Sequence, residues 1–215
     1  GLKTMAVLRE LRGVTPAAEV PDRTPVRAAF IVRDNVRQRR AIERSYVQAI
    51  RHARTRVDIA VPYFYPGRSF RRALHRAAKR GVQVRLLLQG KIDYRIAALA
   101  ARVLYDQMRF AGVRIFEYTP AFLHAKVAVV DNDWATVGSS NIDPLSLLLN
   151  LEANVVVRDP GFASTLAERF DAAFAVSVEV TATPMQAGWR GWLQRALVAW
   201  AAALYLRVAG ITGRY

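Results

Sequence analysis

The sequence of 215 residues contains no cysteine, so disulfide bonds and thiolate metal sites are excluded. Histidine and lysine are scarce, with three and four copies. A long apolar run is also missing, because the hydrophobic stretch at residues 196–206 holds only eleven residues. A helix that crosses a bilayer core needs about 20. We therefore do not expect this stretch to span a membrane.

Arginine is abundant, with 28 copies, and the formal net charge is +15. Such a charge favours an anionic partner, and both nucleic acid and anionic lipid fit. A general preference for arginine on a solvated surface would give the same count. The charge alone therefore does not choose between these explanations.

The hydrophobic pattern predicts an α/β fold. Apolar residues make up 53% of the chain, enough for a packed core. Strand-like and helix-like segments alternate, which predicts a mixed, mainly parallel sheet covered by helices on both faces. Asp159 and Pro160 predict a helix start, followed by the core residues Phe162, Phe170 and Phe174. The predicted strands are 26–32 (buried), 57–64, 82–88, 113–118, 123–131, 134–138 and 151–158, and the predicted helices begin near 39, 69, 94 and 159.

Composition divides the chain into three parts. Residues 1–25 show no sustained period and are interpreted as a junction segment, and residues 26–180 carry the α/β pattern. Residues 181–215 form a tryptophan-rich tail, in which arginines flank the apolar stretch 196–206. This pattern predicts a hydrophobic C-terminal helix lying in a membrane interface. An ordinary helix docked on the domain fits the tail equally well.

The stretch LHAKVAVVDNDWATVGSSN, residues 123–141, combines an apolar hairpin with reactive side chains. If residues 123–131 form a strand, His124 and Lys126 point to the same side, away from the core. The residues that would then face the core are Leu123, Ala125, Val127 and Val129.

The end of this hairpin predicts a phosphate cradle. Gly138, Ser139, Ser140 and Asn141 would bring hydroxyl, amide and backbone N–H groups near Lys126. A histidine at position 124 can act there as a nucleophile or as a general acid near neutral pH. The other two histidines, His52 and His75, have no lysine two positions later and are interpreted as structural.

The spacing His124-x-Lys126-x4-Asp131-x6-Gly138-Ser139-x-Asn141 resembles the signature of the phospholipase D superfamily. The likeness extends over residues 26–175, through AIERSYVQAIRHARTRVDIAVPYFYPG, LLLQGKIDY, GVRIFEY and NIDPLSLLLNLEANVVVRD. These stretches resemble the C-terminal half of bacterial cardiolipin synthases, the B group in particular. Residues 26–180 would then be a phospholipase D-like catalytic half.

This resemblance implies a phosphatidyltransferase that exchanges phosphodiesters between two phosphatidylglycerols through a phosphohistidine. Lys126, Ser139 and Asn141 would hold the phosphoryl oxygens, with Gly138 in the same turn. Asp131 would fix the hairpin, and Glu152 would orient a motif histidine, often that of a facing half. No cofactor is implied. No metal site is expected either, because the acidic residues Asp131, Asp133, Asp143 and Glu152 lack a metal-ligand spacing.

The implied reaction needs two histidines, one as nucleophile and one as general acid. The second motif is therefore expected in a missing N-terminal half, which the start at Gly1 favours, or in a homodimer mate. The sequence does not assign either role to His124. The expected partners are anionic phospholipid and the membrane surface, with a peripheral or monotopic location at the bacterial cell membrane. The alternative is a homodimeric nuclease or phosphodiesterase of the same superfamily acting on nucleic acid.

Overall fold

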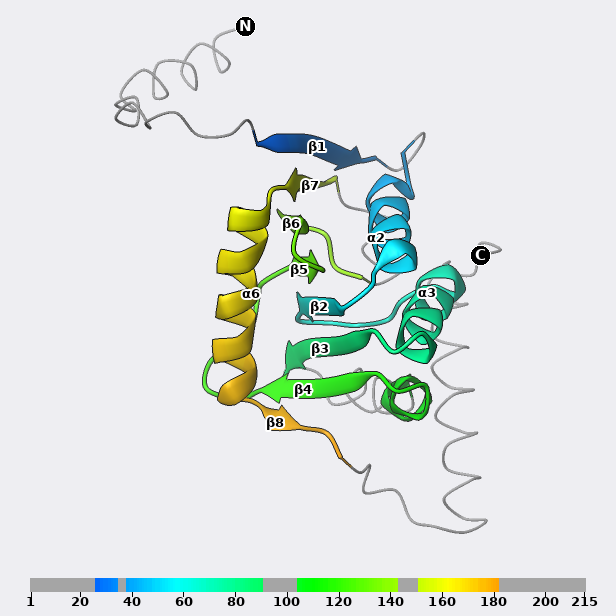
Figure 1. The fold of residues 1–215 in the computed structure, drawn as a ribbon, viewed down its shortest axis with the longest axis vertical. Coiled ribbons are helices and arrows are strands. Elements are labelled where there is room, and N and C mark those ends of the chain that lie inside the picture. The colour runs from blue at the N-terminus through cyan, green and yellow to red at the C-terminus, as the bar shows by residue number, and fades with distance from the viewer. Residues whose placement is uncertain (1–25, 35–37, 91–103, 143–150, 182–215) are drawn as a thin grey trace, which may run out of the picture.

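The computed structural model describes residues 26–34, 38–90, 104–142 and 151–181. Within these ranges the chain forms one eight-stranded sheet with the strand order β1-β7-β6-β5-β2-β3-β4-β8 (Figure 1). The elements are β1 (Arg27–Arg33), α2 (Ala41–His52), β2 (Arg56–Val61), α3 (Arg68–Lys79), β3 (Gln83–Gln89), β4 (Arg114–Tyr118), β5 (Val127–Val130), β6 (Trp134–Gly138), β7 (Glu152–Arg158), α6 (Pro160–Ala175) and β8 (Val178–Glu179).

The sheet is mixed, as predicted, but it is not mainly parallel. Two strand pairs, β2–β3 and β3–β4, are parallel. The other five described pairs are antiparallel. A parallel pair needs a crossover of a dozen or more residues, which α3 provides between β2 and β3. Between β5 and β6 the connection is the three-residue turn 131–133, which permits only an antiparallel hairpin.

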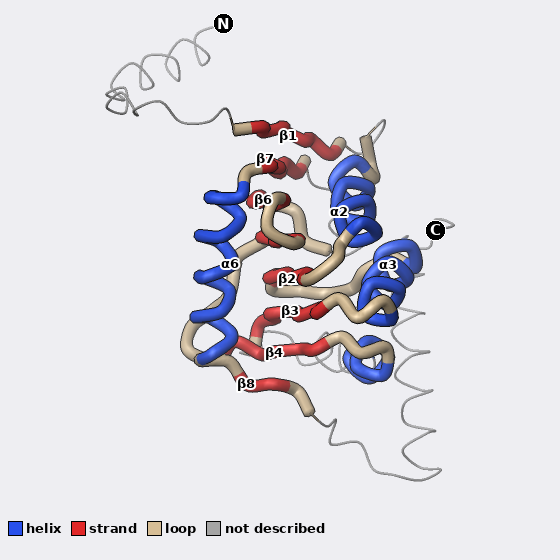
Figure 2. Tube along the Cα trace, in the orientation of Figure 1, coloured by secondary structure: helices blue, strands red, loops and turns tan. Residues whose placement is uncertain are grey.

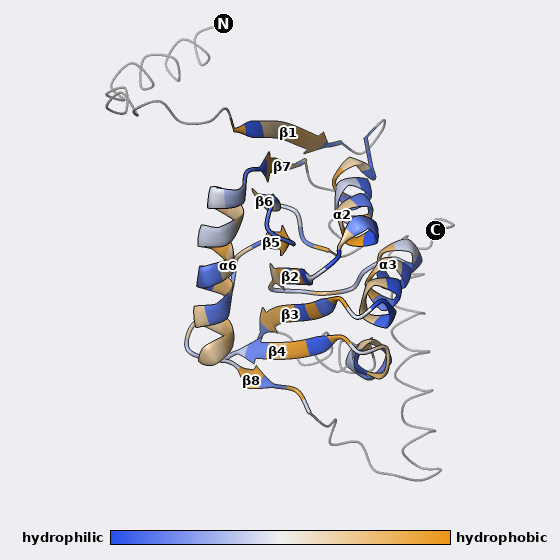
Figure 3. Cartoon of the chain, in the orientation of Figure 1, coloured by the Kyte–Doolittle hydropathy of each residue, from blue (hydrophilic) through white to orange (hydrophobic). Residues whose placement is uncertain are grey.

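Helices cover both faces of the sheet, which confirms that part of the prediction. Figure 2 shows α2 and α3 on one side of the strands and α6 on the other. The larger core lies under α2 and α3 and includes Ile50, Leu74 and Leu86, each fully buried. The second core lies under α6 and includes Val129 and Phe170. Figure 3 shows hydrophobic residues along most strands, the edge strand β1 included.

The start of α6 follows the predicted capping pattern. The Asp159 side chain accepts a hydrogen bond from the backbone N–H of Phe162 at 2.6 Å, and Pro160 occupies the first turn. The aromatic stripe is only partly buried. Phe170 and Phe174 pack in the core, but Phe162 is 40% exposed, so its predicted core position is wrong. Phe162 lies in the first turn of the helix, near the exposed edge of the sheet.

The first strand was predicted to be buried, and it is not. β1 pairs with β7 alone and forms one edge of the sheet. Phe30 is 69% exposed, and Val32 is also exposed. The composition of a strand indicates that it pairs, but not whether a second layer covers it. The opposite edge is β8, a two-residue strand that the pattern did not predict.

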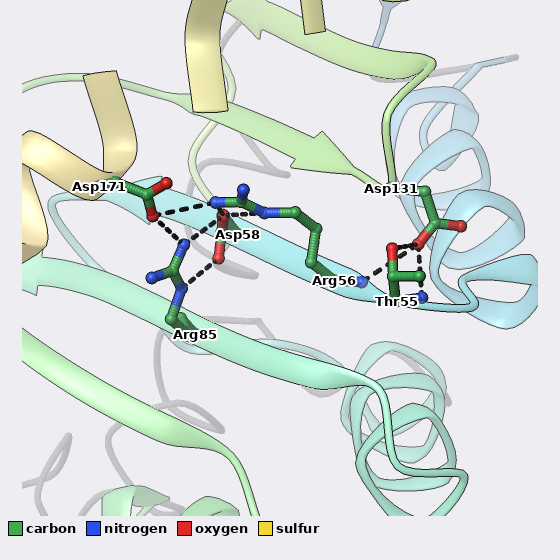
Figure 4. A network of polar contacts seen from close by, with 6 residues as sticks. All are labelled: Thr55, Arg56, Asp58, Arg85, Asp131 and Asp171. Atoms are coloured by element: carbon green, nitrogen blue, oxygen red, sulfur yellow. Dashed lines mark hydrogen bonds and ion pairs between the residues drawn. The ribbon is translucent and has the colours of Figure 1, made fainter. Parts of the chain in front are cut away.

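A polar network within the second core fastens α6 to the sheet (Figure 4). The carboxylate of Asp58 on β2 is fully buried and accepts hydrogen bonds from Arg56 and from Arg85, the latter at 2.7 Å. Both guanidinium groups also reach Asp171 on α6, at 3.1 and 2.6 Å. Partial burial opposes ionisation of Asp171, but the two arginines outweigh it and hold its pKa below its usual range.

The predicted junction segment 1–25 and nearly all of the tail 181–215 lie outside the described residues, as do Asp143 and much of the predicted helix near 94. The division into three parts and the C-terminal helix therefore remain predictions. Among the described residues, no helix combines the length and the apolar character needed to cross a membrane.

Candidate active site

His124 and Lys126 lie immediately before β5 rather than on it, because the strand begins at Val127. The two side chains have different environments. His124 is exposed, whereas Lys126 is only 7% exposed. The Lys126 ammonium donates a hydrogen bond to the backbone carbonyl of His124 at 3.0 Å. The lysine thus braces the backbone that carries the exposed imidazole.

The alternation of core-facing and outward-facing residues that was predicted for residues 123–131 is confirmed for the residues that face α6. Leu123, Ala125 and Val127 all pack against the core under α6. The opposite side is not open to solvent along the strand, because Ala128 and Val130 pack in the core under α2 and α3. Placing Lys126 on a non-core side was therefore wrong. Both faces of β5 are covered, and His124, which precedes the strand, is exposed.

Gly138 ends β6 beside Lys126. Its backbone N–H donates to the Lys126 carbonyl at 3.1 Å. A β-carbon at position 138 would lie 2.3 Å from the Asn154 side chain and 2.4 Å from the Ala153 carbonyl oxygen. Glycine is required here because β7 lies too close for a side chain.

Ser139 and Glu152 are brought into direct contact. The Ser139 hydroxyl donates a hydrogen bond to the Glu152 carboxylate and accepts one from the Ala153 backbone N–H at 3.1 Å. Ser139 is exposed, while Glu152 is 8% exposed. A buried carboxylate therefore sets the orientation of an exposed hydroxyl at the end of the hairpin.

Three buried polar residues support this region and were not among the predicted site residues. Asn154 donates to Thr136 at 3.1 Å and accepts from the backbone N–H of Ser140 at 3.4 Å. Arg33 on β1 lies directly opposite Glu152 in the strand pairing and is 2% exposed. The available signal was the alternation in LEANVVV, where polar residues 152 and 154 interrupt an apolar strand at a step of two.

Asn141 lies on the segment 139–142, which adjoins the loop that follows β2. The Ile142 carbonyl accepts a hydrogen bond from the backbone N–H of Tyr65 at 2.9 Å, and Phe64 forms a bridge with Ile142. Asn141 itself is half-buried. The predicted cradle residues therefore follow β6 at the end of the sheet where β2 also ends.

Asp131 lies apart from the other predicted site residues, at the opposite end of β5 from His124. Its carboxylate accepts hydrogen bonds from the backbone N–H groups of Arg54, Thr55 and Arg56 and from the Thr55 hydroxyl (Figure 4). Partial burial opposes its ionisation, but these bonds outweigh it and lower the pKa of the carboxyl. The backbone of Asp131 is left-handed, with φ of 51°. These bonds connect the turn after β5 to the start of β2, and the hairpin-fixing role of Asp131 stays a prediction.

The chemistry of the arrangement centres on His124. Its exposed imidazole can attack an electrophile or transfer a proton. The Lys126 ammonium, bonded to the His124 carbonyl, and the Ser139 hydroxyl are hydrogen-bond donors of the kind that bind an anionic group. Among the residues that the structure describes, no group of three or more histidine, aspartate or glutamate side chains is arranged to hold a metal ion.

Comparison with known sequences gives a consistent set of relatives. Cardiolipin synthase B from Escherichia coli strain K12 is 45% identical over 163 residues, which cover 74% of this chain and 40% of that protein. Cardiolipin synthase A from Pseudomonas aeruginosa strain LESB58 is 43% identical over 136 residues, covering 63% of this chain and 28% of that protein. The chain thus spans less than half the length of these relatives.

Solved structures share the fold at lower identity. Nuc, a phospholipase D family member from Salmonella typhimurium, superposes with a TM-score of 0.61 at 20% identity, covering 74% of this chain and 100% of that one. Phosphatidylserine synthase from Haemophilus influenzae gives a TM-score of 0.62 at 11% identity, covering 96% of this chain and 52% of that one.

The family comparison includes the hairpin and the strands around it. The model described as the phospholipase D-like domain of cardiolipin synthase matches residues 46–174. This range is more than half of the chain and contains every predicted site residue from His124 to Glu152. The chain therefore belongs to the phospholipase D-like domain family of cardiolipin synthases.

Proposed function

We propose that this chain supplies one of two catalytic motifs of a bacterial phosphatidyltransferase of the cardiolipin synthase type. The observation that carries the proposal is the exposed His124, braced by the buried Lys126 next to Gly138 and Ser139. The identity of 45% to Escherichia coli cardiolipin synthase B supports the lipid substrate. The site would act on phosphatidylglycerol at the cell membrane, with the protein bound peripherally or monotopically.

The proposed reaction has two displacements at phosphorus. In the first, an imidazole nitrogen attacks the phosphorus of phosphatidylglycerol and forms a P–N bond, while the P–O bond to the terminal glycerol breaks. The departing alkoxide takes a proton from a second histidine and leaves as glycerol. In the second, a hydroxyl of another phosphatidylglycerol returns a proton to that second histidine and attacks phosphorus. The P–N bond breaks, and cardiolipin is released.

The residues around His124 have separate roles in this scheme. Lys126 holds the His124 backbone and adds positive charge below the phosphoryl oxygens. Ser139 donates its hydroxyl to the phosphoryl group once it turns from Glu152. Asn141 adds an amide from the same segment. One phosphodiester replaces another, so the exchange requires no nucleotide and no cofactor.

The second histidine would come from another phospholipase D-like domain, either a second half or a second copy of this chain. An exposed apolar row supports such a partner. Phe30 on β1, Val155 on β7 and Val137 on β6 are neighbours across three strands and are 69%, 40% and 42% exposed. Val137 and Val155 directly adjoin Gly138 and Asn154 in sequence, so a domain covering this row would lie beside the site.

The test is to incubate the protein, at a concentration where light scattering shows two assembled domains, with vesicles that contain labelled phosphatidylglycerol and to separate the lipid products. We expect labelled cardiolipin and free glycerol. His124→Ala should abolish both, because it removes either the nucleophile or the proton donor. His52→Ala is the matched control, since His52 is exposed and hydrogen-bonds only the Gln48 carbonyl within its own helix among the described contacts. Equal product formation by both variants would exclude His124 from the chemistry.

The nuclease alternative would give a different result in the same assay. The likeness to Nuc is at 20% identity and establishes the fold alone, so we do not carry its function over to this chain. Release of labelled fragments from single-stranded DNA, together with no turnover of phosphatidylglycerol, would replace the lipid proposal with the nuclease one.

A further inference from the structure

The outer surface of α3 carries an unusual stripe of positive charge. Arg68, Arg72, Arg76 and Lys79 are all exposed and follow one another at steps of four, four and three residues. This spacing places them on one face of the helix, over about 16 Å at ~1.5 Å per residue. The opposite face of α3 is buried through Phe70, Ala73, Leu74 and Ala77. We call the exposed four residues the α3 basic stripe.

No carboxylate neutralises the α3 basic stripe within the described part of the chain. The helix contains no acidic residue, and its neighbour α2 contains one, Glu43. None of the ion pairs formed between described residues includes a member of the stripe. Burial and the nearby charge of Arg68 lower the pKa of Arg71, which lies beside the stripe. Like charges four residues apart destabilise a helix.

Among the described residues, exposed cations are more densely placed on the α2 and α3 side of the sheet than on the α6 side. α2 adds the exposed residues Arg44 and Arg51 next to α3 (Figure 1). On the other face of the sheet, α6 carries Glu168 and Asp171 against Arg169. A uniform surface preference for arginine would charge both faces alike. The asymmetry therefore indicates a flat anionic partner that approaches from the α2 and α3 side.

An exposed aromatic residue lies two positions before a glycine that adjoins α3. Phe110 ends the helical residues 104–110 and is 98% exposed. Gly112, two residues later, lies next to Ala78 of α3: a β-carbon built at position 112 would be 3.6 Å from the Ala78 side chain. Arginine and lysine combined with an exposed phenylalanine are typical of a helix face that rests on a bilayer.

The stripe begins close to the site. The loop from β2 to Arg68 contacts the segment that follows Ser139 and Asn141, through the hydrogen bond of Tyr65 to Ile142 at 2.9 Å. We infer that the α3 basic stripe and Phe110 form the surface by which this protein docks on an anionic lipid bilayer, with the catalytic end of the sheet held next to the headgroups. The inference rests on the proposed function for its choice of lipid over nucleic acid.

The experiment measures co-sedimentation with vesicles of phosphatidylcholine mixed with phosphatidylglycerol, and of phosphatidylcholine alone. The variant Arg72→Gln/Arg76→Gln/Lys79→Gln should bind the anionic vesicles about a hundredfold more weakly, at roughly fivefold per cation near the surface. Arg27→Gln/Arg158→Gln/Arg169→Gln removes the same charge from β1, β7 and α6 and should bind within a few-fold of wild type. Phe110→Ser should weaken binding even in high salt, where charge is screened.

Two further variants make the result unambiguous. Arg72→Lys/Arg76→Lys keeps the charge and should retain binding, which would also show that α3 tolerates substitution. Equal losses in the α3 and control triple variants would overturn the inference, because binding would then follow net charge alone. Unchanged vesicle binding together with weaker binding of a DNA oligonucleotide by the α3 variant would assign the surface to nucleic acid instead.

Turnover separates this inference from the proposed function. On phosphatidylglycerol vesicles the α3 triple variant should be slow, whereas on a short-chain, monomeric phosphatidylglycerol it should match wild type. His124→Ala should bind vesicles normally and turn over neither substrate. If wild type turns over neither substrate but still docks through α3, the proposed function fails and the docking surface stands. If the α3 variant turns over vesicles normally, the docking surface fails and the proposed function stands.

Discussion

The side chain of Asn154 lies against the α-carbon of Gly138, where an added β-carbon would come within 2.3 Å of two of its atoms. Asn154 is held there by its hydrogen bond to Thr136 and by the backbone N–H of Ser140. β6 and β7 therefore leave no room for a side chain at position 138, where the hairpin meets the predicted phosphate cradle. The glycine of the motif serves the packing of two strands as well as any contact with substrate.

We expect Gly138→Ala to destabilise the protein by about 1–3 kcal/mol, the usual cost of overpacking a close contact. The melting temperature should fall by about 2–4 °C for each kcal/mol in a chain of this size. Gly67→Ala is the control, since its β-carbon would meet only the Glu43 carboxylate, at 3.4 Å. Adding Asn154→Ala should restore only part of the loss, because the Ala153 carbonyl would remain 2.4 Å away. A full rescue would show that the side chain, not the strand spacing, requires glycine.

Asp131 should make the stability depend on pH at acidic values. Its folded pKa is lowered, so its stabilising contribution is complete above the unfolded pKa of about 3.9 and is lost as pH falls through the folded pKa. Asp131→Asn should cost about 1–2 kcal/mol at neutral pH, since charged hydrogen bonds are screened at a partly exposed group. The difference from wild type should disappear in strong acid. Urea unfolding at several pH values measures it.

Asp133 in the same turn provides the comparison for Asp131. It forms an exposed pair with Arg158 at 3.3 Å, and such pairs contribute little. Asp133→Asn should therefore leave the pH dependence of unfolding nearly unchanged. Equal effects of the two substitutions would contradict the bracing role of Asp131.

In the polar network on the α6 side, substitution of the buried Asp58 should destabilise the protein far more than substitution of the exposed Asp171. Asp58→Ala leaves Arg56 and Arg85 facing each other without the fully buried carboxylate, and breaking a buried pair typically costs about 3–5 kcal/mol. Asp171 is 53% exposed, so Asp171→Ala should lower the free energy of unfolding by about 1 kcal/mol or less. Chemical denaturation of both variants tests this order. A larger effect at Asp171 would mean that fastening α6 matters more than satisfying the arginines.

Local patterns were sufficient to predict most of the elements and the hairpin. The three-residue turn after β5, the glycine at the end of β6 and the cap at Asp159 each leave a signature within a few residues. The exposure of β1 and the mostly antiparallel pairing of the sheet have no such local signature in the sequence. Both depend on which strands meet across the sheet, and this is decided by contacts between residues far apart in the chain.

The candidate site divides in the same way. His124, Lys126, Gly138 and Ser139 were identified by their spacing, but the burial of Lys126 was not. The prediction that Lys126 lies on a non-core side assumed that one face of the sheet is open to solvent. Here the second helical layer closes that face. Arg33 lies opposite Glu152 in the pairing of β1 with β7, more than a hundred residues away in sequence, so no local pattern could have paired them.

The last prediction concerns the number of domains in a working site. As a species shown to be monomeric by light scattering, the folded chain should not exchange phosphodiesters, because it would hold one histidine of the proposed two-histidine reaction. Removing general acid–base assistance alone typically costs about 10²–10⁴-fold, and removing the nucleophile should cost more. If two copies assemble, activity should rise with the square of protein concentration at low concentration.

Val155→Asp tests whether the apolar row mediates that assembly. Val155 is 40% exposed on β7, so an aspartate there can remain hydrated in the monomer, but it would be buried without a partner once a second domain covers the row. The variant should melt close to wild type and lose the activity that depends on concentration. Thr165→Asp places the same charge at an exposed position of α6 and should retain the concentration-dependent activity. Activity that is first order in a proven monomer would refute the two-motif account, since one chain would then supply every catalytic group.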